Sequence, residues 1–426
     1  MRICIVSQTF APQEEGGAEI VARMSAKELS RHHDVFVLSL GKRGDRLVPT
    51  GESVGDDGIR VVRVNWRNSY LPEHKKPSVG RLEKARWHIK ASVGAVSARD
   101  VMEILKREQV DLIYAHNCAR MQPALFEASR ELNIPLCLHL HDYALICPKS
   151  SMFNATGNCD SPCFKCRVLT SRLKSDGHGM TVIAVSDALK QSYLRAGVLD
   201  KANWHVLRNE NISKGRLHPP LIGRDKARSD VFTFGYLGAL AEEKGIEDLI
   251  RAFVSMPNRN SSRLIVAGRG RDDYVAHLRS LAADAPITWL GFRPAEDVYG
   301  VADAIILPSH WREPQSLILI EAAVYGVPVI ATRLGGTPEI VEEMKTGWCY
   351  DPGVPDALSD MMEKALSIGH QTWWAERDSR FQGIRNFKGT AEESRYYDRL
   401  NALLSKTQRS QNTHMQALEN IAQEKL

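Results

Sequence analysis

The sequence lacks both a long apolar run and an export signal. No stretch of about 18 consecutive apolar residues is present, which excludes a membrane-spanning helix of ordinary length. The first ten residues, MRICIVSQTF, pass directly into a buried-strand pattern and show neither the leader nor the cleavage site of a signal peptide. We therefore expect a cytoplasmic protein whose eight cysteines are mostly reduced.

A strong excess of charge of one sign is also missing. Basic residues outnumber acidic ones by only five over 426 residues, which is too little to indicate a nucleic-acid-binding protein. The excess lies in residues 60–108, which contain twelve Lys or Arg and five Asp or Glu. A solvated basic face explains this stretch as well as a surface for an anionic ligand or an anionic membrane does. Because the stretch has few interleaved aromatic residues, we expect no nucleic-acid partner.

What the sequence does contain is a regular alternation of short apolar runs and amphipathic segments. This alternation is typical of α/β proteins with parallel sheets built from βα units. In the first half, strands are predicted at Ile3–Ser7, Val35–Leu40, Arg60–Val64, Leu112–Ala115, Pro135–His139, Val182–Val185 and His205–Leu207, with helices at Ala18–Ser30, Leu82–Arg107, Pro123–Leu132 and Asp187–Ala196.

A second series follows a break in the pattern. Residues 209–230 are polar and contain paired prolines, which predicts a linker between domains 1–208 and 231–380. Beyond it, strands are predicted at Phe232–Leu237, Leu264–Ala267, Ile287–Leu290, Ala304–Leu307 and Val327–Ala331, with helices at Ile246–Met256, Asp273–Ala283, Pro294–Val301, Ser316–Tyr325 and Asp356–Ser367. Two doubly wound domains in tandem bind ligands at the carboxyl ends of their strands. Residues 406–426 are polar, and we expect a mobile tail there.

Three glycine turns connect a predicted strand to a predicted helix. They contain Gly16-Gly17, Gly238 followed by Lys244, and Gly268 followed by Arg269. Glycine lets the backbone approach an anion closely at a helix N-terminus, and a lysine or arginine there adds a positive charge. None of the three is a G-x-G-x-x-G dinucleotide motif. Plain turns and solvated basic side chains therefore remain the alternative interpretation.

Two glutamates flank the start of an unusually apolar segment. Glu313 and Glu321 are eight positions apart in WREPQSLILIEAAVYGVPVIATR, and Pro314 and Ser316 suit the first turn and the cap of a helix. A rise of about 1.5 Å per residue places the two carboxylates roughly 12 Å apart. That distance is too long for a pair acting on one bond. It matches the span between the sugar and the ribose of a nucleotide sugar.

These segments resemble the family 4 retaining glycosyltransferases, which have the GT-B fold of two Rossmann-like domains facing across a cleft. The resemblance rests on EPQSLILIEA, GVPVIAT, LGGTPEIV and the turns at Gly238 and Gly268. It implies that Glu313 contacts the transferred hexose, that Glu321 holds the nucleotide ribose and that Lys244 contacts the diphosphate. It further implies that the first domain binds the acceptor, the second binds the donor, and helices in 381–405 pack back on the first domain.

The same resemblance assigns the remaining site residues. His141, in HDY, corresponds to the family's active-site histidine, so His141, Glu313 and Lys244 are the predicted catalytic residues. His116 and Asp142 are expected on the acceptor side. The predicted donor-binding set is Gly16, Gly17, Gly238, Lys244, Gly268, Arg269, Glu313, Pro314, Gln315, Ser316, Leu317 and Glu321.

The function implied is transfer of a hexosyl unit from a UDP- or GDP-linked sugar to a glycan or lipid-linked acceptor, with retention, in the assembly of cell-surface polysaccharide or glycolipid. Lys244 and helix N-terminal dipoles would stabilise the leaving phosphate. No D-x-D motif is present, which fits catalysis that requires no metal or other cofactor. The basic stretch adds peripheral contact with the inner face of the membrane as a further expectation.

One position departs from the family pattern. The family has Gly-Arg where this chain has Gly238-Ala239. The missing arginine normally grips the diphosphate, and losing such a contact costs about 1.5–3 kcal/mol of donor binding. Either Arg269 or Arg271 compensates for the missing arginine, or the donor is held differently, or activity is reduced. Two other functions stay open. One is a pseudo-enzyme that binds a sugar nucleotide, which is favoured by Ala239 in place of the family's arginine, and the other is a sugar-nucleotide epimerase.

Four cysteines cluster in one predicted loop. Cys147, Cys159, Cys163 and Cys166 have the spacing C-x₁₁-C-x₃-C-x₂-C directly after His141. In a reducing compartment this pattern suggests a structural zinc ion, with a disulfide pair or free thiols as alternatives.

Overall fold

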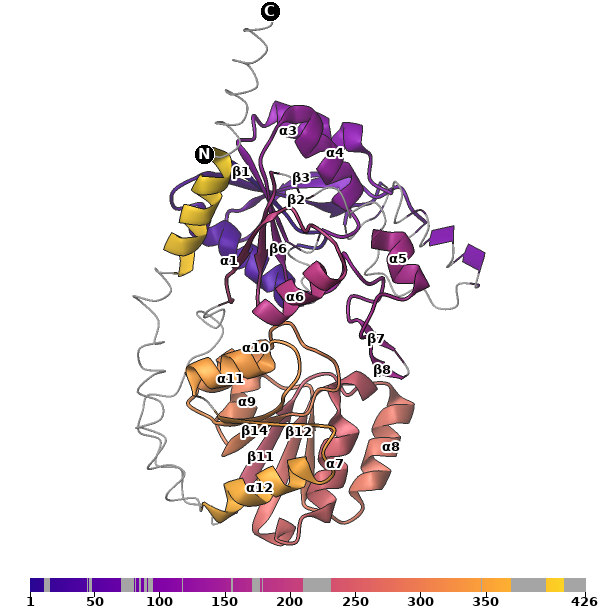
Figure 1. Cartoon of the computed structure of the whole chain (residues 1–426), viewed down its shortest axis with the longest axis vertical. Coiled ribbons are helices and arrows are strands. Elements are labelled where there is room, and N and C mark those ends of the chain that lie inside the picture. Colours follow the sequence, from indigo (N-terminus) through magenta and orange to yellow (C-terminus); the bar gives the residue numbers. More distant parts are fainter. Residues whose placement is uncertain are drawn as a thin grey trace, which may run out of the picture. The chain divides into compact units, whose positions relative to one another are not determined.

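The computed structural model divides into two compact units (Figure 1). It describes residues 1–10, 16–43, 45, 48–69, 80, 82–83, 86–87, 90, 95–116, 118–154, 156–170, 177, 179–209, 231–345, 347–368 and 396–409. The first unit consists of Met1–Ser150, Ser161–Arg208 and the segment from Ser394 onward. The second consists of Ser151–Asp160 and Asn209–Glu393. The predicted linker 209–230 lies outside the described residues except for Asn209.

The first unit is built on a sheet with the order β10-β9-β6-β5-β1-β2-β4-β3 in the described part of the chain. Its strands are β1 (Arg2–Val6), β2 (Asp34–Gly41), β3 (Gly51–Val54), β4 (Arg60–Asn65), β5 (Leu112–His116), β6 (Leu136–Leu140), β9 (Thr181–Ala184) and β10 (Asn203–Val206). All pairings are parallel except that of β3 with β4. The parallel strands were predicted. The exposed edge strand β3 was not, because GESV carries no apolar alternation.

The helices of the first unit are α1 (Gly17–Leu29), α3 (Ala98–Arg107), α4 (Gln122–Leu132), α5 (Phe164–Thr170) and α6 (Asp187–Arg195). The single helix predicted over Leu82–Arg107 is wrong as a continuous element. Residues 95–97 are not helical, and the Ser97 hydroxyl accepts a hydrogen bond from the Asp100 backbone N–H at 3.3 Å, which starts α3. A short hairpin, β7 (Phe153–Asn154) with β8 (Gly157–Asn158), was also not predicted, and it belongs to the second unit.

The second unit has a parallel sheet with the order β13-β12-β11-β14-β15-β16. Its strands are β11 (Phe232–Leu237), β12 (Ser262–Ala267), β13 (Ile287–Gly291), β14 (Ala304–Leu307), β15 (Val329–Thr332) and β16 (Gly347–Tyr350). Numbered within the unit, this is the 3-2-1-4-5-6 order of a doubly wound fold. The strand order therefore reverses between β11 and β14, and ligands of such sheets bind outside the carboxyl ends of the strands at that point.

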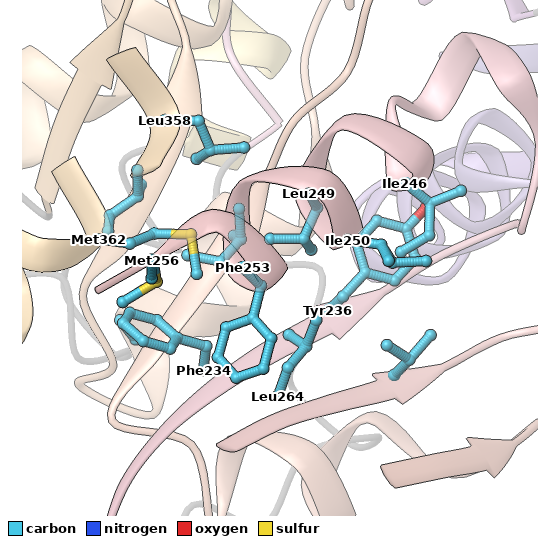
Figure 2. Close-up of a cluster of buried hydrophobic side chains, with 14 of the residues drawn as sticks. Phe234, Tyr236, Ile246, Leu249, Ile250, Phe253, Met256, Leu264, Leu358 and Met362 are labelled. Carbon is cyan, nitrogen blue, oxygen red and sulfur yellow. The ribbon is translucent and has the colours of Figure 1, made fainter. Parts of the chain in front are cut away.

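Helices cover both faces of this sheet (Figure 1). They are α7 (Ile246–Ser255), α8 (Asp272–Ala282), α9 (Ala295–Tyr299), α10 (Leu317–Val324), α11 (Thr337–Met344) and α12 (Ala357–Ser367), with short 3₁₀ turns η1 (Glu242–Lys244) and η2 (Arg259–Ser261). On one face, the side chains of α7 and α12 meet those of β11 and β12 in a buried cluster that includes Phe234, Phe253 and Met362 (Figure 2). A second cluster, with Ile305 and Leu319, fills the other face.

A helix over residues 396–409 packs into the core of the first unit. Tyr396, Leu400 and Leu404 are at most 2% exposed and join the cluster that contains Ile3 and Leu112. The helix extends past Ser405, where we placed its end, because Thr407 is buried and its hydroxyl bonds to that of Thr181 at 2.7 Å. Residues 410–426 of the predicted tail lie outside the described residues. In the described part of the chain, no helix is both long and apolar enough to cross a bilayer.

Candidate active site

Most of the functional residues predicted in the second unit lie in loops at the carboxyl ends of neighbouring strands, and Leu317 and Glu321 lie on α10, which follows one of these loops. Gly238 and Lys244 follow β11, Gly268 and Arg269 follow β12, and Glu313 follows β14. Because β11 and β14 are adjacent, Lys244 and Glu313 stand on either side of the point where the strand order reverses. The sheet topology thus brings together two residues that are 69 positions apart in the sequence.

Lys244 and Glu313 form a direct ion pair. The Lys244 Nζ donates to Glu313 Oε1 at 2.7 Å and lies 5.0 Å from the centre of the Trp311 ring. Ser309 Oγ and Trp311 Nε1 donate to the same oxygen at 2.6 and 3.2 Å. Burial alone would raise the pKa of Glu313, but the charge and the hydrogen bond of Lys244 and the serine hydroxyls lower it below its ordinary value. The carboxylate is therefore held ionised in a nearly buried position.

The start of α10 differs from its prediction. The helix begins at Leu317, so Pro314 lies in the preceding loop rather than in the first turn. Ser316 is the N-cap residue, but its side chain makes no cap hydrogen bond, because its hydroxyl bonds to Glu313 instead. The Gln315 side chain exchanges two hydrogen bonds with the backbone of Asn209, at 2.9 and 3.1 Å. The five predicted donor-binding residues from Glu313 to Leu317 all lie in the segment that connects β14 to the first residue of α10.

Glu321 is half-buried on α10. The hydroxyl of Tyr299 donates to Glu321 Oε2 at 2.9 Å. This hydrogen bond offsets part of the hydration free energy that a carboxylate loses in an apolar helix. Tyr299 was missed from the sequence, since an isolated tyrosine on a different helix gives no local signal.

The turns after β11 and β12 pack against each other. A Cβ on Gly268 would lie 1.8 Å from the carbonyl oxygen of Gly238, so no other residue fits there. The Leu240 N–H donates to the Arg269 carbonyl at 2.8 Å, which places Arg269 beside the exposed Ala239. The Arg269 guanidinium lies 4.6 Å from the centre of the Phe292 ring, whereas that of Arg271 pairs with Asp273 at 3.3 Å.

In the first unit, three histidines meet at the ends of β5 and β6. His116 Nδ1 and His141 Nε2 are 2.9 Å apart, and His139 Nδ1 lies 2.7 Å from the Tyr114 hydroxyl. Among the described residues these three form the one group of potential metal ligands within 4.8 Å of one another. Burial lowers the pKa of His141 to about 3 and those of His116 and His139 well below the ordinary value. His139 was missed, although its spacing of two from His141 places both on one face of the strand.

Asp142 and the Gly16-Gly17 pair lie in the same unit. Burial raises the pKa of Asp142 to about 6, although its carboxylate accepts a hydrogen bond from the Ala144 N–H at 2.7 Å. Gly16 is the N-cap residue of α1. A Cβ there would come within 2.8 Å of Glu19, the carboxylate of which accepts from Thr9 at 3.0 Å.

Three of the four clustered cysteines lie in the first unit. The Sγ atoms of Cys163 and Cys166 are 3.6 Å apart, and a hydrogen bond with the free thiol of Cys147 contributes to the raised pKa of Cys166. Cys159 belongs to the second unit, where Asn154 Nδ2 donates to its sulfur at 3.4 Å. Hydrogen bonds from Cys166 lower the pKa of the exposed Cys163. The predicted zinc site stays a prediction.

Three of the twelve basic residues in 60–108 form ion pairs with nearby carboxylates. Arg60 and Arg107 both pair with Glu108 and Glu52, and Arg67 pairs with Asp100. Residues 70–79 and Arg81, which contain other basic side chains of this stretch, lie outside the described residues.

Two family models match the chain. One is described as a glycosyl transferase 4-like domain and matches residues 16–210. The other is described as glycosyl transferases group 1 and matches residues 222–380. The first match contains the three histidines, and the second contains the loops that hold Lys244 and Glu313.

Similar proteins cover nearly the whole chain. An uncharacterized 42.6 kDa protein in the cps region of Klebsiella pneumoniae is 23% identical over 344 residues, which are 80% of this chain and 87% of that protein. HepE of Anabaena, solved in complex with UDP, is similar with a TM-score of 0.66 at 22% identity over 94% of this chain and 100% of that chain. A further structure of HepE contains UDP-glucose. WaaG, a glycosyltransferase involved in lipopolysaccharide biosynthesis, has a TM-score of 0.59 at 16% identity over 96% and 99% of the two chains.

Proposed function

We propose that this chain, which belongs to the group 1, family 4 glycosyltransferases and has their GT-B fold, transfers a hexosyl unit from a UDP- or GDP-linked sugar to a glycan or lipid-linked acceptor with retention. The observation that carries the proposal is the buried, ionised Glu313 paired with Lys244 at the reversal point of the second sheet. The complexes of HepE with UDP and UDP-glucose support a nucleotide-sugar donor.

The proposed roles follow from the chemistry of each side chain. Glu313 Oε1 accepts three hydrogen bonds within the protein. Its second carboxylate oxygen accepts hydrogen bonds from hydroxyl groups of the transferred sugar. Lys244 is more exposed than Glu313, with 28% of its side chain accessible, and is free to turn from the carboxylate to the diphosphate. The first N–H groups of α10 add partial positive charge where negative charge develops on the leaving phosphate.

We assign Glu321 to the ribose hydroxyls and Arg269 to the place of the missing arginine at Ala239. Arg269 is the better candidate than Arg271, because its backbone adjoins the Ala239 turn and no carboxylate holds its guanidinium in the described residues. In the first unit, His141 acts as a neutral hydrogen-bonding group beside the sugar, since burial keeps it uncharged at neutral pH. His116 and Asp142 belong to the acceptor side.

The proposal includes transfer without a metal, and a zinc ion with a purely structural role at the clustered cysteines. It places the protein at the cytoplasmic face of a membrane, where the basic residues 75, 76 and 81 contact anionic lipid and the acceptor belongs to polysaccharide or glycolipid assembly. The relation to WaaG supports the acceptor class. Activity that survives EDTA, together with zinc found by elemental analysis, would bear out both metal statements. Loss of activity in EDTA would contradict the first, and no zinc in the isolated protein the second.

A nucleotide titration tests the donor site. The melting temperature is measured with UDP, GDP, ADP and their common sugar conjugates for the wild type and for Glu321→Ala, Glu313→Gln and Arg269→Ala. Glu321→Ala and Arg269→Ala each weaken nucleotide binding about tenfold through loss of a hydrogen bond to a charged group. Glu313→Gln binds nucleotide nearly as well as the wild type but lowers turnover. Glu296→Ala, on the exposed side of α9, is the matched control and changes neither quantity.

The outcomes separate the alternatives. No shift with any nucleotide would refute the donor site. A shift without consumption of sugar nucleotide would indicate a binding protein, and conversion of the donor without acceptor would indicate an epimerase.

A further inference from the structure

The β7–β8 hairpin contacts the loop that carries Glu313. The hairpin lies between β6 and α5 in the sequence, yet it belongs to the second unit (Figure 1). The loop after β14 was found from its own sequence motif. The hairpin, with two residues in each strand, gave no signal of a functional role.

A single side-chain amide joins the two segments. Asn158 Nδ2 donates to the His310 carbonyl at 2.6 Å, and Asn158 Oδ1 accepts from the Arg312 N–H at 3.0 Å. One amide thus satisfies an acceptor and a donor that are two residues apart, as a neighbouring strand would. Among natural side chains only Asn and the longer Gln carry an amide, which offers a carbonyl acceptor and an NH₂ donor side by side.

The Arg312 side chain adds hydrogen bonds that run from the loop to the residues directly after β8. Its Nη1 donates to the Cys159 carbonyl at 3.2 Å, and its Nη2 pairs with Asp160 Oδ1 at 2.6 Å. The hairpin and the loop are therefore joined by four hydrogen bonds, two of which involve Asn158. Asp160 is largely exposed, so its ion pair contributes less than the amide contacts do.

The residue between the two clamped positions is Trp311. Its indole N–H donates to Glu313 Oε1 at 3.2 Å, and its ring faces the Lys244 ammonium at 5.0 Å. The Glu313 N–H in turn donates to the Trp311 carbonyl at 2.9 Å. Fixing residues 310 and 312 therefore fixes the backbone from which both Trp311 and Glu313 project.

The loop has further anchors, because Thr332 Oγ1 donates to the Ser309 carbonyl at 2.9 Å and the Gly336 N–H donates to the Glu313 carbonyl at 2.8 Å. His310 pairs through Nε2 with Asp248 Oδ2 at 2.7 Å, and its N–H donates to the Glu243 carbonyl at 3.0 Å. The backbone bond holds the loop against η1, the turn that ends at Lys244, and the side-chain pair holds it against α7. The bonds of His310 do not restrain Arg312, whose backbone N–H donates to Asn158 Oδ1.

We propose that Asn158 is a positioning residue for the donor site: it clamps the 310–312 backbone, and so sets Trp311 and Glu313 for a nucleotide sugar. The inference rests on the proposed function. It assigns a role in donor binding to a residue of β8, which lies outside the sequence motifs of the second unit.

The test compares two asparagines of the same hairpin. In Asn158→Ala both clamp bonds are lost. In Asn154→Ala, the control, the lost bonds are those within the hairpin, to Thr156 and Cys159. The amide of Asn158 also has a conservative replacement, because Asn158→Asp keeps an acceptor for the Arg312 N–H but loses the donor to the His310 carbonyl.

Two measurements are made on each full-length variant. Hydrogen exchange of the 309–316 peptide is expected to be faster in Asn158→Ala and close to wild type in Asn154→Ala. The dissociation constant of the nucleotide that binds the wild type is expected to rise about tenfold in Asn158→Ala, because loss of two hydrogen bonds leaves the loop less ordered. Asn158→Asp is expected to lie between the two.

The outcomes distinguish this inference from the proposed function. Unchanged exchange in Asn158→Ala would refute the clamp whatever the protein binds. Faster exchange with unchanged nucleotide affinity and donor KM would refute the positioning role. Equal effects of Asn154→Ala and Asn158→Ala would show that hairpin integrity, rather than the amide, matters. A wild type that binds no nucleotide would refute the proposed function and the positioning role, while exchange would still report on the contact itself.

Discussion

At the residue scale, the pair Lys244–Glu313 explains how an acidic group is kept ionised where little water reaches it. Removing the lysine leaves the carboxylate buried without its counter-charge, which is strongly destabilising for a buried pair and less so here, because Lys244 is partly exposed. We expect Lys244→Met to cost about 2 kcal/mol of unfolding free energy at pH 7.

The pH dependence has a definite sign. In the wild type the pKa of Glu313 is lowered, so its stabilising effect is present above the ordinary pKa and is lost as the pH falls. In Lys244→Met only the serine hydroxyls still oppose the effect of burial, so the pKa of Glu313 rises and the penalty shrinks as the pH falls toward 4. The double variant Lys244→Met/Glu313→Gln should recover most of the loss. Urea unfolding at pH 7 and pH 4.5 measures the loss of unfolding free energy in Lys244→Met. Equal losses at the two pH values would contradict the role of the ion pair.

The limits of sequence reasoning are visible in the same residues. Glu313, Glu321 and Lys244 were found because they lie in local motifs of fixed spacing. The partners Tyr299 and Ser309 were missed, because they reach the glutamates only through the fold. Ser316 was assigned to the helix cap, which is its usual role, but the neighbouring carboxylate binds its hydroxyl more strongly.

At the scale of elements, Glu108 joins several parts of the first unit. It follows α3 directly and pairs with Arg60 on β4, with Arg107 on α3 and with Arg2 on β1. Hydrogen bonding from Arg60, followed by that from Arg107, lowers the pKa of this nearly buried carboxyl to about 2. The stabilisation it provides is therefore complete above the ordinary pKa of about 4.5 and is lost as the pH falls toward 2.

We expect Glu108→Gln to lower the unfolding free energy of the first unit by about 2 kcal/mol at pH 7, from a pKa shift of this size discounted for solvent. The difference from wild type should decrease below pH 4.5. Asp100→Asn, which breaks the exposed pair with Arg67, is the control and should cost less than about 0.5 kcal/mol. A loss at pH 3 as large as that at pH 7 would rule out the charge as its cause.

The elements themselves were predictable to different degrees. Buried parallel strands such as β11 and β14 were predicted with identical bounds, because apolar runs between turns are their direct signature. The strands and α-helices that were missed, β3, β7, β8, β16, α5 and α11, are short, and most of their residues are exposed or half-buried. Such segments are held by neighbours that a sequence window does not contain.

At the scale of the whole molecule, each unit has a hydrophobic core of its own. The core of the first unit includes the helix at 396–409, which returns from the far end of the chain. The cores of the second unit lie on the two faces of its sheet. The alternation of strands and helices predicted both sheets, and the family resemblance placed the last helix with the first unit. Composition alone could not have done so, since the returning segment resembles any amphipathic helix.

Separate cores imply that the two units respond separately to perturbation. Leu400 is fully buried in the first unit, and Leu400→Ala should cost about 2–5 kcal/mol there. A nucleotide at about one hundred times its dissociation constant should stabilise the unit that binds it by about 2.7 kcal/mol. In calorimetry, we expect Leu400→Ala to lower one transition and nucleotide to raise the other. Lys406→Ala, on the exposed side of the same helix, should move neither. If both perturbations moved a single common transition, the units would unfold as one, and the site at Lys244 and Glu313 would depend energetically on the unit that carries the histidines.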